Sequence, residues 1–325
     1  MTARTGVLLV NLGTPDAPEP AAVRRYLGEF LSDRNVVDLP AWLWQPILRG
    51  AILPFRPRRT AEAYRLIWTG EGSPLAAITR RQAVALQGRL GNAFVVEYAM
   101  RYGTPAIASA LDRLAEAGCG RILAAPLYPQ FSGATTGTAE MALTAAFAAM
   151  DSEIPMRILP PYFDDDLYIG ALATNIERQL AALDFEPQRL LVSFHGLPQR
   201  MVERGDPYFI HCIETARLLG ERLPVPADIA FQSRFGRAKW LEPATAATLV
   251  EYPGKGVTRI AIAAPGFSVD CVETLEELGL RGRDSFLAAG GEKFARLDCL
   301  NDSPEGMAML EALVRRELAG WLPRA

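Results

Sequence analysis

Short apolar runs alternate with amphipathic segments of helical length along the whole chain, and this alternation restricts the fold more than any other feature. Buried strands are predicted over residues 7–10, 94–97, 122–125, 156–159, 190–194, 228–231, 260–264 and 294–297. Helices are predicted over 21–31, 75–90, 106–117, 136–149, 167–183, 208–222, 243–251, 270–280 and 307–321. Strands that alternate with helices indicate parallel sheets covered on both faces.

The two halves of the chain also resemble each other. LLVNLGTP (8–15) is similar to LLVSFHGLP (190–198), and RILAAPLYPQFS (121–132) is similar to RIAIAAPGFSVD (259–270). A chain of 325 residues is also long for a single core. We therefore expect an α/β protein with two similar Rossmann-like domains, each a four-stranded parallel sheet flanked by helices. Ligands of such sheets bind at the carboxyl ends of the strands, which places the expected site in a cleft between the domains.

The expected domain boundaries follow from this duplication. The first domain covers 1–162 and the second 163–325, and the last helix, over about 304–321, is a candidate for packing back on the first domain. An insertion over about 40–73 contains AWLWQPILRGAILPF, which prolines interrupt too often for a spanning helix. Two interpretations stay open. The insertion is either a capping subdomain that buries its own apolar face, or a hydrophobic lip that covers a large apolar ligand, with contact between the lip and a membrane surface left open.

Composition excludes several classes of protein. A net charge of −3 gives no electrostatic reason to expect nucleic-acid binding. Four cysteines without a CxxC pair exclude a disulfide framework and the common zinc-ribbon patterns. No uninterrupted apolar stretch has the length of a membrane span, and the first residues do not resemble a signal peptide. We expect a cytoplasmic protein.

Two groups of polar residues are candidates for chemistry. His195 ends a predicted strand and precedes Gly196, so it is expected at the functional edge of the sheet. Asp270, Glu273 and Glu277 follow another strand at spacings that would place them on one face of an α-helix. The three carboxylates suit either a solvated helix start or, opposite His195, a site that handles a divalent cation or protons.

Seven separated segments together resemble one known family. They are NLGTPDAPEP, FLSDRNVV, RYGTP, YPQFSGATTG, LLVSFHGLPQR, FQSRFGRAKWLEP and APGFSVDCVETLEELG. In this order they resemble ferrochelatase, which inserts Fe2+ into a porphyrin as the last step of haem synthesis. The resemblance covers nearly the whole chain, and it implies two chelatase-type domains that hold the porphyrin between them.

The resemblance also implies roles for individual residues. His195 matches the catalytic histidine, and Glu273 matches the carboxylate opposite it. Asp270 and Glu277 match the acidic residues that accompany Glu273, and together with His195 and Glu273 they form the expected metal set. The positions that match porphyrin contacts are Leu12, Phe30, Leu31, Arg56, Arg59, Tyr64, Ser73, Arg101, Tyr128, Gln232, Ser233 and Trp240.

The chain departs from those family members that bind a [2Fe–2S] cluster. Gly133 stands in the YPQ loop where such members have a cysteine, and the chain ends ELAGWLPRA without one. We therefore expect no cluster and no tightly bound cofactor, with Fe2+ as a substrate. The segments FHGLPQR and GFSVDCVETLEE, together with the insertion, resemble those of the family branch that uses protoporphyrin IX to form haem b. Coproporphyrin is the alternative substrate.

Porphyrin metallation requires the loss of two pyrrole protons, and distortion of the ring exposes the nitrogen lone pairs. We expect His195 to accept a proton with help from Glu273, while direct ligation of iron by His195 stays open. Two other functions also stay open: a non-catalytic tetrapyrrole carrier, and a chelatase for a different ring or metal. The expected partners are protoporphyrin IX and Fe2+, and contacts with a membrane or with haem-pathway enzymes stay open.

Overall fold

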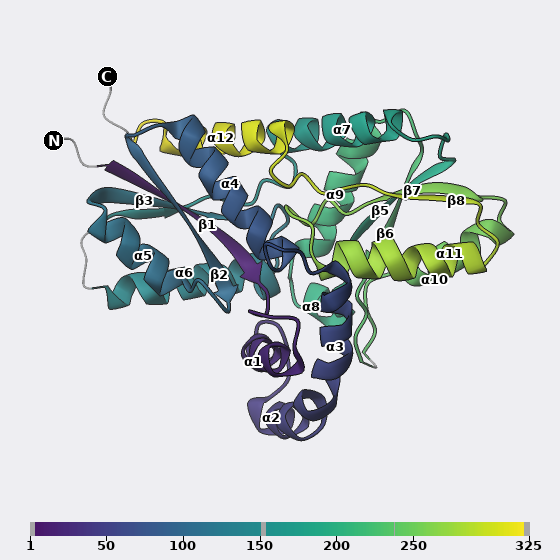
Figure 1. The fold of residues 1–325 in the computed structure, drawn as a ribbon, viewed down its shortest axis with the longest axis horizontal. Coiled ribbons are helices and arrows are strands. Elements are labelled where there is room, and N and C mark those ends of the chain that lie inside the picture. Colours follow the sequence, from purple (N-terminus) through teal and green to yellow (C-terminus); the bar gives the residue numbers. More distant parts are fainter. Residues whose placement is uncertain (1–3, 151–153, 237, 322–325) are drawn as a thin grey trace. The chain divides into compact units, whose positions relative to one another are not determined.

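The computed structural model describes residues 4–150, 154–236 and 238–321. The chain divides into two compact units. Unit 1 comprises 1–128, 132–161 and 307–325, and unit 2 comprises 129–131 and 162–306. Each unit is built on one sheet of four parallel strands (Figure 1). The predicted α/β class with two four-stranded parallel sheets is therefore confirmed.

The sheet of unit 1 has the strand order β2-β1-β3-β4. Its strands are β1 (Arg4–Gly13), β2 (Phe94–Tyr102), β3 (Cys119–Pro126) and β4 (Met156–Ile158). Its helices are α1 (Pro20–Phe30), α2 (Ala41–Ile47), the π-helix η1 (Leu48–Ile52), α3 (Leu53–Ile67), α4 (Pro74–Leu90), α5 (Ile107–Glu116), the π-helix η2 (Gly133–Gly137), α6 (Thr138–Ala149) and most of α12 (Pro304–Leu318).

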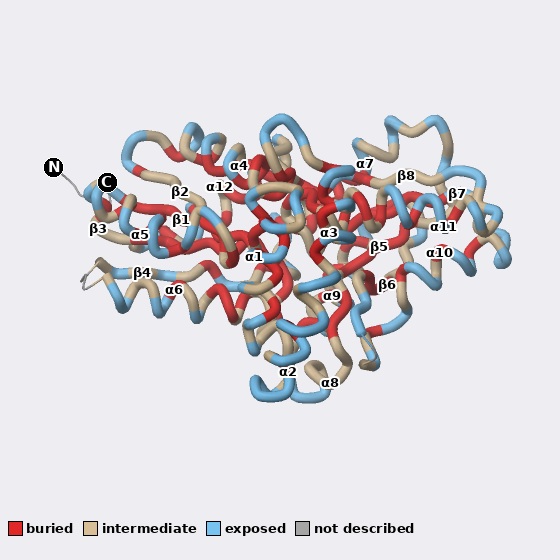
Figure 2. Tube along the Cα trace, turned by 60° about the horizontal axis from the view of Figure 1, so that its bottom comes forward, coloured by how far each residue is buried: buried red, intermediate tan, exposed pale blue. Residues whose placement is uncertain are grey.

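A continuous apolar run places β1 in the interior of unit 1. Leu8 and Val10 of β1 are fully buried among residues of α5 and α6 on one face of the sheet. The opposite face is covered by α4, on which α12 packs through the ion pair of Arg89 with Glu311 (Figure 1). Buried residues follow the strands in Figure 2, whereas α2 is mostly exposed.

Unit 2 repeats this arrangement with the strand order β6-β5-β7-β8. Its strands are β5 (Arg189–His195), β6 (Ala227–Gln232), β7 (Arg259–Ala263) and β8 (Lys293–Arg296). Its helices are α7 (Asp166–Ala181), α8 (Gln199–Glu203), α9 (Tyr208–Gly220), α10 (Thr245–Gly254), the π-helix η3 (Glu273–Gly282) and α11 (Arg283–Ala288). Residues of α10, η3 and α11 bury Leu191 and Ile262 on one face of the sheet, and α7 and α9 lie on the other (Figure 1).

Two segments differ from the prediction. The insertion, for which no helix was predicted, forms α2, η1 and α3 despite the internal prolines Pro46 and Pro57. The helix predicted over 270–280 is a π-helix, and it leaves Asp270 outside its first residue, Glu273. The three carboxylates therefore do not lie along one face of an α-helix. The reason is that Asp270 is held by side-chain contacts before the helix begins.

Candidate active site

His195 is the last residue of β5, and its imidazole is half-buried. Nδ1 of the ring lies 2.7 Å from the carbonyl oxygen of Gly196. A carbonyl oxygen can only accept a hydrogen bond, so Nδ1 must carry the hydrogen and the Nε2 of the neutral ring is left as an acceptor. The backbone thus fixes a tautomer that can take up a proton at Nε2.

The glycine after His195 is required by the close approach of the neighbouring strand. The Gly196 N–H donates to the carbonyl oxygen of Gln232, at 2.7 Å. A Cβ atom at residue 196 would lie 2.6 Å from that same oxygen and 3.1 Å from Cε3 of Trp240. The His-Gly pair therefore ends β5 against the end of β6, where His195 is paired with Gln232.

Gln232 and Ser233 connect this strand end to η3. The Gln232 amide donates to the carbonyl oxygen of Glu273 at 3.1 Å and accepts from the Ser193 hydroxyl at 2.8 Å. The N–H and the hydroxyl of Ser233 donate to the Glu277 carboxylate at 2.8 and 2.6 Å. These two bonds hold the backbone of Ser233 at a φ of 64°, a value that residues other than glycine rarely adopt. The structure thus brings His195, Gln232, Ser233 and both glutamates to one edge of unit 2.

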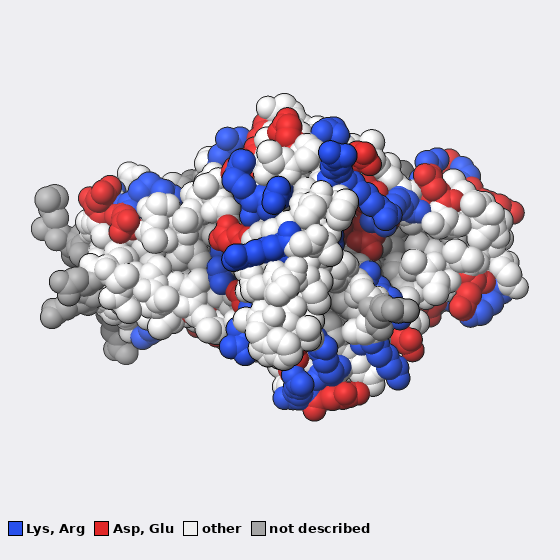
Figure 3. Space-filling view, turned by 90° about the horizontal axis from the view of Figure 1, so that it is seen from below, with Lys and Arg blue, Asp and Glu red and all other residues white. Residues whose placement is uncertain are grey.

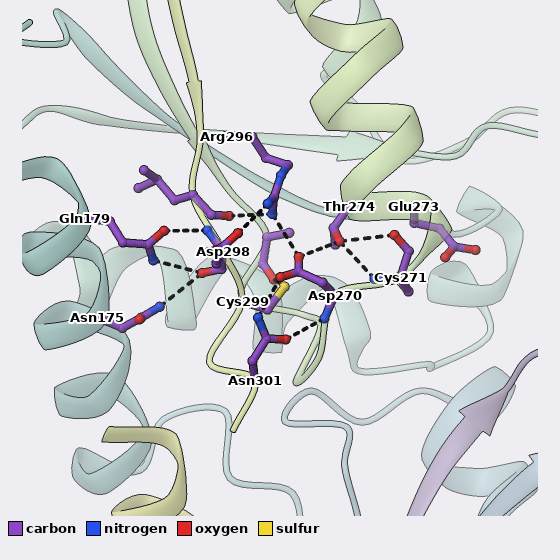
Figure 4. A network of polar contacts seen from close by, with 12 residues as sticks. Asn175, Gln179, Asp270, Cys271, Glu273, Thr274, Arg296, Asp298, Cys299 and Asn301 are labelled. Atoms are coloured by element: carbon purple, nitrogen blue, oxygen red, sulfur yellow. Dashed lines mark hydrogen bonds and ion pairs between the residues drawn. The ribbon is translucent and has the colours of Figure 1, made fainter. Parts of the chain in front are cut away.

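Asp270 is in a different situation from the two glutamates. It is 4% exposed, and its carboxylate accepts from Thr274 at 2.7 Å, from Arg296 at 2.9 Å and from Asn301 at 2.7 Å. Figure 4 shows these three side chains pointing toward Asp270, while the Glu273 carboxylate points away from them. Most of the acceptor capacity of Asp270 is therefore used within the protein.

In unit 1, Arg101 is held by a compact polar cluster. The Asp33 carboxylate accepts from Arg101 at 2.7 Å, from the Tyr102 hydroxyl at 2.8 Å and from the Thr138 hydroxyl at 2.5 Å. Burial alone would raise the pKa of Asp33, but these bonds, the Asn35 N–H and the charge of Arg101 outweigh it and lower that pKa. Asp33 lies within the segment FLSDRNVV, but nothing in the sequence distinguishes it from the other acidic residues.

The apolar and aromatic residues assigned to porphyrin contacts lie at the end of α1 and near the ends of β1 and β3. Phe30 packs edge-on against Tyr102, with ring centroids 5.1 Å apart, and Leu31 is buried. Leu12 is partly buried at the end of β1. The buried Tyr128 hydroxyl has no hydrogen-bond partner among the described residues, and burial raises its pKa. An unpaired buried hydroxyl is costly, which makes Tyr128 a candidate for a ligand contact.

The remaining assigned residues lie on or beside the insertion, except for one in unit 2. Tyr64 is buried on α3 and packs edge-on against Trp68, whereas Arg59 is exposed and Arg56 is half-buried. Ser73 precedes α4 and accepts a hydrogen bond from Thr14 at 2.8 Å. In unit 2, the Trp240 indole donates to the carbonyl oxygen of Phe235 at 2.8 Å.

Two further observations concern metals and membranes. Within residues 4–150, 154–236 and 238–321, no group of three or more His, Cys, Asp or Glu side chains is arranged to hold a metal ion. In the same part of the chain, no helix has both the length and the apolar character needed to cross a bilayer.

Comparisons with known proteins identify the family. The family model described as Ferrochelatase matches residues 4–318. A ferrochelatase of Methylocella silvestris is 52% identical over 98% of this chain and 95% of its own length. A ferrochelatase of Rhizobium meliloti is 51% identical, with 98% of this chain and 96% of its own length covered.

A solved structure agrees at the level of the fold. SirB from Bacillus subtilis with Fe3+ has a TM-score of 0.58 at 13% identity, covering 98% of this chain and 97% of that chain. This similarity shows a chelatase-type fold. The sequence relatives show more, because they match almost end to end at about half identity. The chain therefore belongs to the ferrochelatase family, and its reaction is the insertion of Fe2+ into a porphyrin in haem synthesis.

Proposed function

We propose that the porphyrin substrate is protoporphyrin IX and that the product is haem b. The supporting observation is the insertion of residues 40–73, whose helices expose large apolar side chains that include Trp42 and Phe55. Protoporphyrin has two carboxylates and apolar vinyl groups, whereas coproporphyrin has four carboxylates. An apolar insertion therefore suits the less charged ring.

In this proposal His195 accepts pyrrole protons at Nε2, because its Nδ1–H is committed to the Gly196 carbonyl. Glu273 assists as a second proton acceptor, and Glu277 handles either protons or the incoming cation. Arg101 interacts with the substrate while Asp33 supports its guanidinium. Apolar contact from Phe30, Leu31 and Leu12 contributes binding energy for holding the ring in a distorted shape.

The test compares the two porphyrins under anaerobic conditions with Fe2+. We expect haem formation, followed by its absorption spectrum, with a higher kcat/KM for protoporphyrin IX than for coproporphyrin III. The reverse preference would assign the chain to the coproporphyrin-using branch. Porphyrin binding without any metallation would instead support a carrier.

Glu273 and Glu277 should differ in their effect on turnover. We expect Glu273→Gln to lower kcat/KM by about 100-fold or more, and Glu277→Gln to cost less. If Glu277 guides the cation, its substitution raises the KM for Fe2+ alone, and if it relays protons, kcat falls and the pH profile shifts. The exposed Glu251→Gln is the control for the lost charge. Parameters within about twofold of wild type for both variants would make the glutamates a simple helix-start pattern.

The insertion also supports a proposal of peripheral membrane contact. Trp42 and Phe55 are 78% and 74% exposed, and exposed arginines, among them Arg49 and Arg58, lie on the same segment. Figure 3 views the side that carries α2 and α3, and it shows uncharged atoms with charged side chains of both signs beside them. Exposed aromatic groups bordered by arginines suit the interface of an anionic bilayer.

The two tryptophans of α2 provide a test of this proposal. Trp42→Ser should weaken binding to anionic vesicles while leaving thermal unfolding unchanged, because the side chain is exposed. Trp44→Ser should lower the free energy of unfolding by about 3 kcal/mol or more, because its buried indole donates to the Leu31 carbonyl at 2.6 Å. Equal vesicle binding by wild type and Trp42→Ser would favour the capping-subdomain interpretation.

We also propose that the purified protein carries no iron–sulfur cluster. Cys119, Cys212, Cys271 and Cys299 are all buried and unbridged, and a cluster requires about four thiolates at one site. We expect anaerobically purified protein to lack both the visible absorption of a [2Fe–2S] centre and acid-labile sulfide. Detection of both would contradict the proposal.

A further inference from the structure

The start of η3 is anchored by Asp270. Its carboxylate accepts from the Thr274 hydroxyl, the Arg296 guanidinium and the Asn301 amide. The backbone N–H of Asp270 donates to the Asn301 side-chain oxygen at 2.8 Å. Thr274 follows Glu273 directly and also accepts from the Cys271 N–H at 3.0 Å. The backbone on both sides of Glu273 is therefore tied to one buried carboxylate (Figure 4).

Arg296 connects this anchor to the sheet. It is the last residue of β8, and its guanidinium also pairs with Asp298, which the α7 residues Asn175 and Gln179 hold in turn (Figure 4). The stem of Arg296 passes against η3 at Gly279. A Cβ atom at residue 279 would lie 2.8 Å from Cδ of Arg296, so any larger residue there must displace the arginine or the helix.

A second ion pair fits the π-helical register of η3. Arg281 donates to both oxygens of Glu276, at 2.8 and 3.0 Å, across a spacing of five residues. In an α-helix, residues five apart point about 140° away from each other. In a π-helix the repeating hydrogen bond joins residues five apart, so their side chains lie about one turn apart. Side-chain contacts thus support the register at both ends of η3.

We propose that Asp270 and Arg296 are positioning residues whose ion pair fixes the start of η3 and thereby the place of the Glu273 carboxylate. Asp270 is then neither an iron ligand nor a proton carrier, although the family resemblance groups it with the metal-handling residues. The inference rests on the proposed role of Glu273, because it concerns how that carboxylate is held.

A double-mutant cycle on Asp270 and Arg296 distinguishes a positioning role of the ion pair from a direct role of the Asp270 carboxylate in the reaction. We expect Asp270→Asn and Arg296→Met each to lower kcat by about 10- to 100-fold with the dissociation constant for porphyrin unchanged, as misplacement of one reacting group does. The double variant should recover most of the activity, because it removes both charges and leaves an amide whose oxygen can still accept from the Thr274 hydroxyl. A double variant as inactive as Asp270→Asn would show that the carboxylate itself acts on iron or protons, and would overturn the proposal.

A second cycle tests the contact at Gly279. Gly279→Ala should lower kcat in the wild type but add no further loss to Arg296→Ala, which lacks the Cδ atom that the new methyl group meets. Gly88→Ala, at an open position within α4, is the matched control and should leave kcat unchanged. Equal losses from Gly279→Ala in both backgrounds would show that Arg296 does not transmit the effect.

Hydrogen exchange gives a readout that does not depend on activity. Amides of residues 273–282 should exchange faster in each single variant and return toward the wild-type rate in Asp270→Asn/Arg296→Met. Unchanged exchange in the single variants would overturn the proposed anchoring. If the wild-type protein formed no haem, the proposed function would fail, while this measurement would still decide whether the ion pair holds η3.

Discussion

Replacement of His195 by alanine is expected to lower kcat for porphyrin metallation by about 100-fold or more, the usual contribution of a well-placed general base. Nε2 of His195 is the atom expected to receive the proton, because Nδ1 is engaged by the Gly196 carbonyl. The substitution removes this acceptor while leaving a small side chain at the end of β5. Porphyrin affinity, measured by fluorescence quenching, should therefore stay near the wild-type value.

The other histidine provides the comparison. His211 stacks on Phe163 with ring centroids 3.7 Å apart, and its Nδ1 accepts from the Phe131 N–H at 3.1 Å. His211→Ala should therefore lower the melting temperature and leave kcat at 25 °C within a few-fold of wild type. Substantial turnover by His195→Ala at neutral pH would remove that residue from the mechanism, and a loss of kcat confined to His211→Ala would reverse the assignment.

The central strands were predictable because they are buried on both faces. Segments such as 7–10 and 260–264 have no polar alternation, and the structure places them at the centres of the two sheets. The strand order in each sheet was not predictable from such runs. The strand order depends on contacts between strands that are distant in sequence. The internal repeat could indicate only that the two sheets would have the same order.

The π-helix was not predictable from residue spacing. α- and π-helices differ in which carbonyl each N–H reaches, and both can carry glutamates four residues apart on neighbouring positions. The role of Asp270 was hidden for another reason. Its main partner, Arg296, lies 26 residues away in β8, so the local sequence around Asp270 shows a carboxylate but not the cation that pairs with it.

The prolines of the insertion exclude a membrane-spanning helix but do not exclude the short helices that the structure shows. Pro54 lies at the start of α3, where its missing N–H has no intrahelical partner to lose. Pro46 and Pro57 lie within helical segments, and the irregular turn η1 joins those segments. Burial of Trp44, Ala61 and Tyr64 stabilises the segment against the cost of the prolines.

Asp33→Asn is expected to lower the free energy of unfolding by about 3 kcal/mol, since it leaves a largely buried arginine without its counter-charge. The side chains of Asp33 and Arg101 are only 10% and 20% exposed, so water replaces the lost contacts poorly. Thermal and denaturant unfolding at pH 7 measure the effect. The matched control is Asp184→Asn, whose partner Lys293 and own side chain are 48% and 76% exposed, and which should leave the free energy of unfolding nearly unchanged because water screens this surface pair.

The difference in unfolding free energy between wild type and Asp33→Asn should depend on pH, because the pKa of Asp33 is lowered in the folded protein. An unfolded aspartate has a pKa of about 3.9, so the unfolded chain takes up the proton first as the pH falls. The stabilisation by the Asp33 carboxylate is therefore complete above about pH 5 and is lost as the pH falls through the folded-state pKa. The gap in stability between wild type and Asp33→Asn should narrow from pH 5 to pH 3, whereas a gap due to packing alone would stay constant. A constant gap, or equal melting of Asp33→Asn and Asp184→Asn at pH 7, would show that the ion pair with Arg101 does not stabilise unit 1.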